Sequence, residues 1–306
     1  MAHPIFSFGI AFTIITITFG ACHAPEQTET AQASFVSQRM PNNFGAYWYQ
    51  GEAEVNSYAL QQSRYGEERS GDAVLVFVTE DFSKSKQVKL DYSGQAGGDK
   101  VSVLKLNAIR KFKTGIYDYS MMESVFTPVD LKTYPHTFKT STTAQDWCGH
   151  SFTQVNLQDK GYQVTEFSYF ESEGDQTVKI GKVLLEDEIW TRLRINPSSI
   201  PEGQVEVLPA AFHSRLAHLK IEPKQARISI QEGEEYSLLQ LDYLHLERSL
   251  SIQFETAFPH KIISWKENNG RRGITTGKLK KTLKTAYWSQ NSNRYEVLRD
   301  SLQLSF

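Results

Sequence analysis

Short apolar segments with the two-residue period of β-strands recur along this chain, and this feature restricts its fold most strongly. Leu250, Ile252 and Phe254 alternate with polar residues, which is typical of a strand with one buried face. Residues 73–78 (AVLVFV) are continuously apolar, which favours a strand buried on both faces. Such segments follow one another at a spacing of about eight to twelve residues, so we expect a mainly β protein built on a large antiparallel sheet or open barrel.

The composition agrees with a folded β protein. The 306 residues include 18 Phe, 14 Tyr and 5 Trp, and aromatic side chains suit pleated surfaces. With 33 basic and 35 acidic side chains, the net charge of -2 provides no overall field to attract DNA or RNA. We therefore expect no nucleic-acid partner.

Two local features of the strands lead to specific predictions. Asn268-Asn269-Gly270 lies between two strand-like segments and predicts a hairpin turn. The apolar positions from Tyr162 change phase at Glu166, which predicts a β-bulge there.

Two helices are expected in the middle of the chain. Their apolar stripes are Leu185, Ile189 and Leu193 in the first, and Phe212, Leu216 and Leu219 in the second. The first covers residues 184–195 and ends before Pro197, and the second follows Pro209. We expect both helices to cover the apolar face of the sheet. No linker rich in Pro, Gly or Ser divides residues 39–306, so they are predicted to form a single β-rich domain.

The N-terminus predicts export and a lipid anchor. Residues 5–21 are uncharged and almost wholly apolar, and this segment is shorter than the roughly 20 residues that a spanning helix needs. The word Phe19-Gly20-Ala21-Cys22 resembles the lipobox of bacterial lipoproteins. We interpret residues 1–21 as a signal peptide and Cys22 as the lipidated residue. The alternatives are a simple signal peptide with an incidental cysteine, or a buried apolar segment.

Residues 22–38 are predicted to be the lipidated cysteine and a flexible tether, because they are poor in large apolar side chains. A lipid anchor of this kind attaches a protein stably to a membrane. Since residue 23 is His rather than Asp, the sorting rule of enteric lipoproteins indicates the outer membrane. The expected localisation is therefore the cell envelope.

Cys148 lies in the most chemically suggestive word of the sequence, Asp146-Trp147-Cys148-Gly149-His150. Redox exchange needs a second cysteine, and position 151 is Ser. A nucleophilic Cys–His pair is normally assembled by the fold rather than by neighbours in sequence. We therefore expect Cys148 to be a buried structural thiol.

Two acidic segments are candidates for acid–base chemistry. Glu80 and Asp81 are adjacent on a strand and point to opposite faces, so they cannot flank one bond. Residues 186–188 (Glu-Asp-Glu) open the first predicted helix, where acidic side chains interact favourably with the helix dipole. We interpret both segments as structural.

No motif in the chain predicts a metal site, a cofactor or a catalytic residue. His-Glu-x-x-His, Cys-x-x-Cys and Gly-x-Ser-x-Gly are absent. Basic residues are concentrated at residues 261–300, with ten Lys or Arg against three acids, near Tyr287 and Trp288. They have two interpretations, an anion-binding surface or lysines that protect an exposed edge strand, and the second is favoured.

Four words carry a resemblance to a known family: YALQQSRYGEERSGDAVLVFVTEDF (58–82), TAQDWCGHSFTQ (143–154), LLEDEIWTRLR (184–194) and YW (287–288). They resemble a group of uncharacterised bacterial lipoproteins, some of which carry the label septum formation inhibitor Maf. True Maf proteins are nucleotide pyrophosphatases with an Ala-Ser-x-Ser-Pro-Arg-Arg motif, which does not occur here. The resemblance implies a lipoprotein and supplies no catalytic residues.

We therefore expect a lipid-anchored, non-enzymatic envelope protein. Its aromatic-rich β domain would bind an apolar, glycan or protein ligand. The alternatives are an envelope hydrolase whose carboxylates converge only in the fold, and an envelope assembly or division factor acting through protein contacts.

Overall fold

The structure is a computed structural model that describes Met1 and residues 43–306. The predicted signal peptide beyond Met1, Cys22 and the tether to residue 38 lie outside the described residues. Among the helices that are described, none is both long and apolar enough to cross a membrane.

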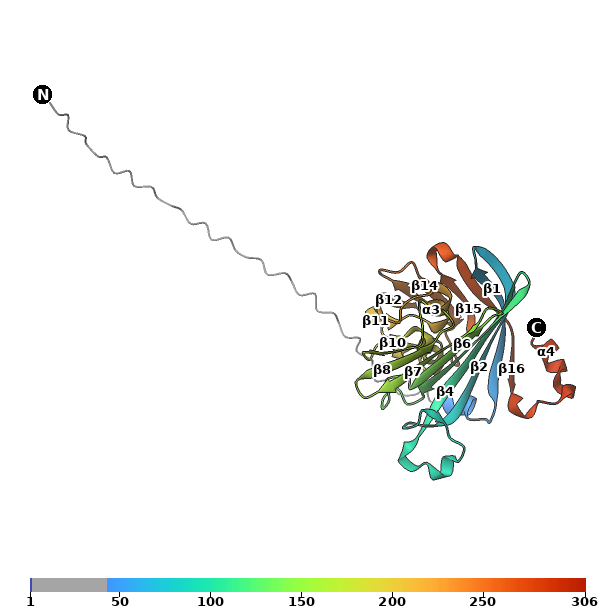
Figure 1. Ribbon diagram of the computed structural model, residues 1–306. Coiled ribbons are helices and arrows are strands. Elements are labelled where there is room, and N and C mark those ends of the chain that lie inside the picture. The colour runs from blue at the N-terminus through green and yellow to red at the C-terminus, as the bar shows by residue number, and fades with distance from the viewer. Residues whose placement is uncertain (2–42) are drawn as a thin grey trace. The chain divides into compact units, whose positions relative to one another are not determined.

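Sixteen strands and four α-helices make up the described part of the chain (Figure 1). The strands are β1 (Ala53–Arg64), β2 (Glu67–Ser83), β3 (Val88–Lys89), β4 (Lys100–Thr114), β5 (Tyr117–Pro128), β6 (Lys139–Gln145), β7 (His150–Gln158), β8 (Gly161–Phe167), β9 (Gln176–Ile180), β10 (Leu184–Leu185), β11 (Gly203–Leu208), β12 (Lys224–Gln231), β13 (Tyr236–Tyr243), β14 (Ser249–Glu255), β15 (Ile262–Asn268) and β16 (Ile274–Thr285). The helices are α1 (Phe44–Trp48), α2 (Ile189–Ile195), α3 (Ala211–Ala217) and α4 (Val297–Ser301).

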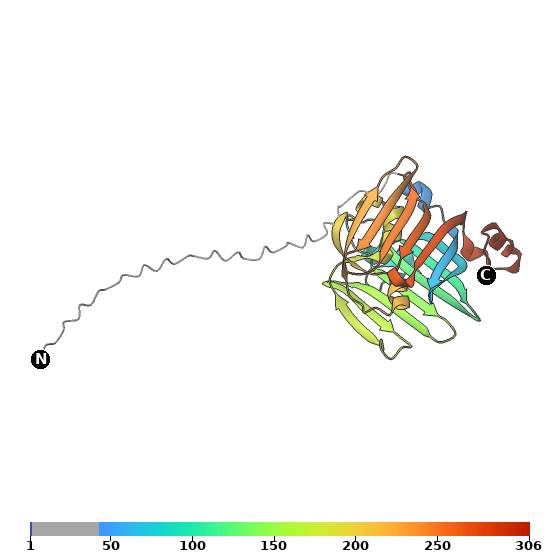
Figure 2. The ribbon, with the colours of Figure 1, turned by 90° about the horizontal axis from the view of Figure 1, so that it is seen from above.

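All sixteen strands belong to one sheet that curves into an open barrel, as Figure 2 shows from above. The order runs from β10 through β16 to β1 and β2, and then through β4 to β9, with β3 beside β2. Each ladder along this path is antiparallel except the parallel pair β10–β11. The predicted fold class, a mainly β chain with a large antiparallel sheet, is confirmed.

The two mid-chain helices pack against the apolar inner face of the sheet. Ile189 and Leu193 of α2 belong to the same buried cluster as Tyr58 of β1, Leu106 of β4 and Ile252 of β14. Because these strands come from both halves of the barrel, α2 fills the space between them. The helix is shorter than predicted, since residues 184–188 form β10 and the 3₁₀ helix η3 (Glu186–Glu188).

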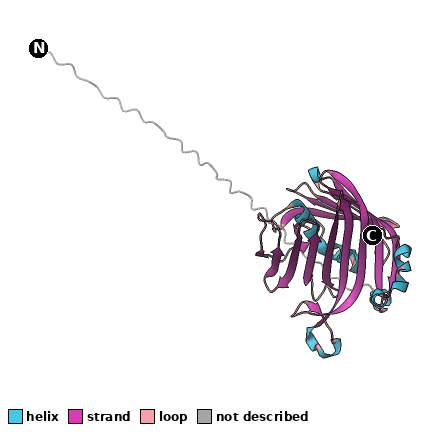
Figure 3. Cartoon of the chain, turned by 45° about the vertical axis from the view of Figure 1, so that its right-hand side comes forward, coloured by secondary structure: helices cyan, strands magenta, loops and turns pink. Residues whose placement is uncertain are grey.

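Strand β2 is buried on both faces, as the apolar run predicts. Its inner side chains, which include Phe77, join the core around α2. Its outer side chains, which include Val76, pack against Leu302 and Leu304 of the segment that follows α4. Figure 3 shows α4 against the outside of the sheet. The C-terminal segment therefore gives β2 its second buried face.

The hairpin prediction is confirmed and the bulge prediction is wrong. Strands β15 and β16 pair across residues 269–273. Strand β8 keeps an unbroken register with β7 and with β9, so there is no bulge at Glu166. Tyr162, Val164 and Glu166 are buried on one face, and the carboxyl of Glu166 accepts a hydrogen bond from Gln176. The apparent change of phase arises because an acidic residue occupies an inward position.

Candidate functional site

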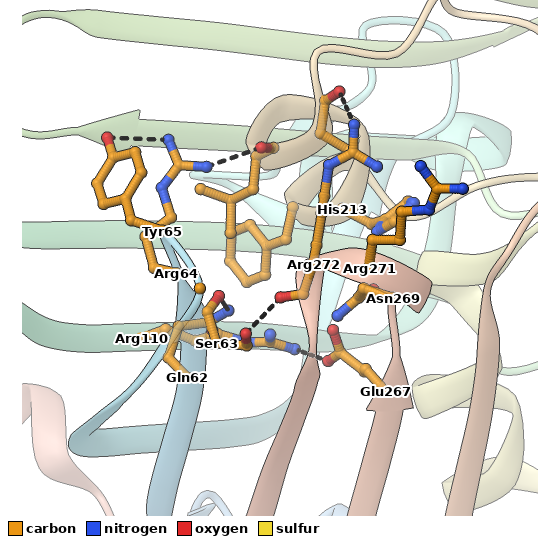
Figure 4. A pocket seen from close by; sticks show the side chains of 14 residues that line it. Gln62, Ser63, Arg64, Tyr65, Arg110, His213, Glu267, Asn269, Arg271 and Arg272 are labelled. Atoms are coloured by element: carbon orange, nitrogen blue, oxygen red, sulfur yellow. Dashed lines mark hydrogen bonds and ion pairs between the residues drawn. The ribbon is translucent and has the colours of Figure 1, made fainter.

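A cavity of about 250 Å³ lies at one end of the open barrel. It is formed by the turn between β1 and β2, the inner face of β4, helix α3 and the turn between β15 and β16. Its lining residues are Gln62, Ser63, Arg64, Tyr65, Gly66, Arg110, Phe212, His213, Leu216, Ala217, Glu267, Asn269, Arg271 and Arg272. Figure 4 shows these side chains around the cavity.

Strand pairing brings the two halves of the pocket together. The β1–β16 ladder places the end of β1 against the turn that precedes β16. The amide of Gln62 donates to the hydroxyl of Thr275 at 2.9 Å, and the hydroxyl of Ser63 donates to the carbonyl of Arg272. Gly273 has a φ of +87°, and a Cβ there would collide with the Ser63 hydroxyl, so the close approach requires glycine.

Three arginines at the pocket carry charge that no carboxylate of the described residues neutralises. Arg64 donates to the carbonyl of Leu216 at 2.8 Å and to the hydroxyl of Tyr119 at 3.1 Å. Arg272 donates to the carbonyl of Ala217 at 3.2 Å. Within residues 43–306, no carboxylate forms an ion pair with Arg64, Arg271 or Arg272. The pocket therefore has a positive surface, suited to an anion.

The floor of the pocket is electrically balanced. Arg110 and Glu267 form a buried ion pair at 2.5 Å, and Glu267 lies 3.8 Å from Arg248. Burial opposes the charge of Glu267, but Arg110 and Arg248 outweigh this and lower its pKa. The Arg110 guanidinium also lies over the ring of Phe212, 5.0 Å from its centre. The floor is a fixed element of structure rather than a source of free charge.

Two buried polar side chains in the pocket keep one atom without a partner among the described residues: Oε1 of Gln62 and Nε2 of His213. Their exposed fractions are only 2% and 6%. Burial, followed by the charge of Arg248, lowers the pKa of His213 to about 4, so its imidazole is neutral near pH 7. A buried polar atom without a partner is costly, so a ligand that reaches these atoms gains free energy.

The acidic segment at residues 186–188 was predicted to open the first helix, and it forms the 3₁₀ helix η3 directly before α2. All three side chains are buried in η3. Glu186 pairs with Arg248 and accepts from the Tyr243 hydroxyl at 2.7 Å. Glu188 pairs with Arg192 at 3.0 Å, as their i,i+4 spacing predicts. The segment enters the barrel interior because it leads directly into the buried helix α2.

Asp187 meets a second buried acid, Glu123 of β5. Their carboxyls are hydrogen-bonded to each other, and burial raises the pKa of Glu123 to about 7 and that of Asp187 well above its usual range. Asp187 also accepts from the backbone amide of Ala211 at 3.2 Å. The pair lines a chamber of about 20 Å³ that shares Arg110, Phe212 and Glu267 with the larger pocket. The two carboxyls thus lie behind the pocket floor.

The prediction that Cys148 is buried is wrong. Its side chain is exposed, and so is that of Trp147 beside it. Residues 146–149 form the turn between β6 and β7, where the carboxylate of Asp146 accepts the amide hydrogen of Cys148 at 2.6 Å. A turn at the open end of the barrel has no layer above it, so the thiol reaches solvent.

The remaining candidates are dispersed. Glu80 pairs with Lys105 at 3.2 Å, and Asp81 pairs with Lys100 at 2.8 Å. The basic residues at 261–300 were interpreted as lysines that protect an edge strand. Over residues 276–278, β16 pairs with β15 on one side and β1 on the other, so this part is not at an edge of the sheet. Beyond Lys278, β16 pairs with β1 alone. Within the described part of the chain, no group of three His, Cys, Asp or Glu side chains is placed to hold a metal ion.

Comparisons with known proteins identify no family. No protein-family model matches the chain, and no curated protein matches it. A crystal structure of a β-barrel-like protein of a domain of unknown function, DUF1849, from Brucella abortus is similar, with a TM-score of 0.44 and 9% sequence identity. The match covers 76% of this chain and 96% of that chain. The chemistry of the pocket therefore rests on its own residues.

Proposed function

We propose that this protein is a lipid-anchored, non-enzymatic component of the cell envelope that binds a small anionic ligand at the open end of its barrel. One observation carries the proposal: Arg64, Arg271 and Arg272 surround a cavity without a carboxylate partner in the described chain. Guanidinium groups recognise carboxylates and phosphates through paired hydrogen bonds.

The cavity favours an anion over an apolar ligand. Helix α2 and the strands around it fill the apolar interior, and the space that stays open is lined largely by polar side chains. Its volume of about 250 Å³ lies just below the range typical of drug-sized ligands, which indicates a small occupant. An acidic component of a glycan fits both conditions.

Calorimetric titration of the full chain in detergent with glucuronate, glutarate and inorganic phosphate tests this function, with glucose as the neutral control. At least one anion should bind, and its affinity should fall as salt is added, because salt screens exposed charges. The double variant Arg271→Ala/Arg272→Ala should weaken binding about tenfold or more, whereas Arg227→Ala, an exposed arginine on β12, should not. Equal anion affinity in the double variant and in Arg227→Ala would contradict the proposal.

The lipid anchor needs a separate test, because Cys22 lies outside the described residues. Replacing Cys22 with Ser should move the protein from the membrane fraction to the soluble fraction of the envelope. Unchanged fractionation would show that attachment does not depend on Cys22, and would leave the pocket proposal intact.

A hydrolase is the second candidate, and the Glu123–Asp187 pair is the observation that favours it. Raised pKa values in a pair of carboxyls are a feature of acid–base catalysis. The chamber beside them holds only about 20 Å³, and Phe212 and Arg110 lie between it and the larger pocket. If the protein is a hydrolase, Glu123→Gln should abolish turnover of a glycan substrate and leave anion binding in place.

A further inference from the structure

The pocket offers more than positive charge, and its other groups define a ligand class. Resting on the proposed anion-binding function, we infer that the ligand is a hydroxylated anion of monosaccharide size, an acidic sugar. The arginines bind its carboxylate or phosphate, and the unpartnered atoms of Gln62 and His213 form hydrogen bonds with its hydroxyl groups. The apolar face of its ring packs against α3.

The free polar atoms require hydroxyl groups rather than a second charge. Gln62 presents a carbonyl oxygen, which accepts a hydrogen bond, and a neutral His213 presents a ring nitrogen that donates or accepts according to its tautomer. A hydroxyl group donates and accepts, so it satisfies both atoms. A carboxylate only accepts, and it would leave the Gln62 oxygen without a partner.

One wall of the pocket is apolar. Phe212, Leu216 and Ala217 of α3 line the cavity together with the polar end of β1 and the turn between β15 and β16. A pyranose ring has hydroxyl groups at its edge and C–H groups on its faces, so one molecule contacts both walls. A flexible aliphatic dicarboxylate lacks the hydroxyls, and a neutral sugar lacks the charge.

Exposed aromatic side chains extend this surface beyond the pocket. Tyr65, Trp147 and Tyr169 have exposed fractions of 59%, 70% and 61%. They lie on the β1–β2, β6–β7 and β8–β9 connections, which antiparallel pairing places at the same end of the barrel. Aromatic rings offer flat apolar surfaces to sugar rings. The acidic sugar is therefore expected as the terminal residue of a longer glycan.

The test compares glucuronate with glutarate, inorganic phosphate and a glucuronate-terminated oligosaccharide, by calorimetric titration of the full chain in detergent. Glucuronate should bind at least about tenfold more tightly than glutarate, because one or two additional hydrogen bonds are made. A glucuronate-terminated oligosaccharide should bind more tightly than free glucuronate if the aromatic surface contributes, and equally if the natural source is the free sugar acid. Glutarate or phosphate binding as well as glucuronate would overturn the inference and leave the anion-binding function standing. Failure of every anion would overturn both.

Two variants locate the hydroxyl recognition. Gln62→Met removes the carbonyl oxygen at similar size, and His213→Phe removes the ring nitrogens. Each should reduce the preference for glucuronate over glutarate about five- to tenfold while leaving glutarate affinity unchanged. An unchanged preference in folded variants, verified by circular dichroism, would overturn the assignment of these two residues. Gln62 also donates a hydrogen bond to Thr275, so Gln62→Met could fail to fold. In that case the glucuronate preference of His213→Phe alone tests the assignment.

Discussion

Two acidic segments of this protein carry similar charge and lie in opposite surroundings. Glu80 and Asp81 lie near the end of β2, where each pairs with a partly exposed lysine from neighbouring β4. Glu186, Asp187 and Glu188 lie inside the barrel, where Glu186 pairs with an arginine and Asp187 with another acid. Water reaches Asp81 and Lys100, whose side chains are 34% and 43% exposed, so their ion pair contributes little to stability. The second segment depends on its protein partners for nearly all of its solvation.

The interior of the barrel holds charged as well as apolar side chains. Apolar side chains of α2 and of the strands around it fill one part of the interior. The remaining volume holds a network that runs from Arg110 through Glu267 and Arg248 to Glu186. This network forms the floor under the proposed ligand, so it fixes Arg110 and keeps the pocket open. Four predictions test the contrast between the buried and the solvated regions.

The largest effect is expected from Glu186→Gln. Removing the charge leaves the buried Arg248 guanidinium poorly compensated, which should lower the free energy of unfolding by about 3–5 kcal/mol. Asp81→Asn is the matched control, because Asp81 and Lys100 form the exposed ion pair of the other segment, and it should cost less than about 1 kcal/mol. Urea unfolding followed by circular dichroism measures both values. Similar costs for the two variants would show that the buried and the exposed ion pairs contribute equally to stability.

Leu193→Ala tests how firmly α2 holds the acidic segment inside. Leu193 is fully buried between both halves of the sheet, so its truncation should cost about 2–5 kcal/mol. The strands on both sides of the helices should still unfold together, because they belong to one sheet. Two separated transitions in the wild type, or a stable fragment ending near residue 180 after limited proteolysis, would contradict this expectation.

The buried acids should give stability an unusual dependence on pH. The pKa of Glu123 is raised to about 7 from an ordinary 4.5, so the folded state holds a proton that the unfolded chain releases. The contribution of Glu123 to the free energy of unfolding is complete below pH 4.5 and is lost as the pH rises through 7. This change is of the order of 3 kcal/mol. Glu54 has the opposite sign: burial opposes its charge, but Arg194 lowers its pKa to about 2, so its contribution is lost as the pH falls from 4.5.

Unfolding measurements at pH 5 and pH 8 isolate the effect of Glu123, because the contribution of Glu54 changes only as the pH falls below about 4.5. In the wild type, Glu123 should make the protein less stable at pH 8 than at pH 5. The Glu123→Gln variant cannot release a proton, so its stability should change by about 3 kcal/mol less between the two pH values. An identical pH difference in the variant and the wild type would show that Glu123 is ionised in the folded state.

The sequence predicts apolar burial well and polar burial poorly. The alternation of β14, the doubly buried β2 and the turn before β16 follow from local patterns of apolar and turn residues, because each depends on near neighbours. The pocket depends on distant ones: Ser63 and Arg272 meet although they are 209 positions apart. Glu186 and Arg248, 62 positions apart, neutralise each other only in the fold. The basic run that contains Arg271 and Arg272 was the one local signal of the site, and it did not indicate Arg64, Gln62 or His213.

Cys148 provides the smallest expected effect and the clearest contrast with the buried acids. The apolar character of a thiol favours burial, but the Asp146 carboxylate fixes a turn that holds Cys148 at the open end of the barrel. Cys148→Ser should therefore change the free energy of unfolding by less than about 0.5 kcal/mol. A maleimide reagent should label Cys148 in the native protein at nearly the rate seen in denaturant, since exposure governs access to the thiol. Protection of Cys148 until denaturant is added, together with a loss of several kcal/mol in Cys148→Ser, would show that the β6–β7 turn folds inward and that the open end of the barrel is covered.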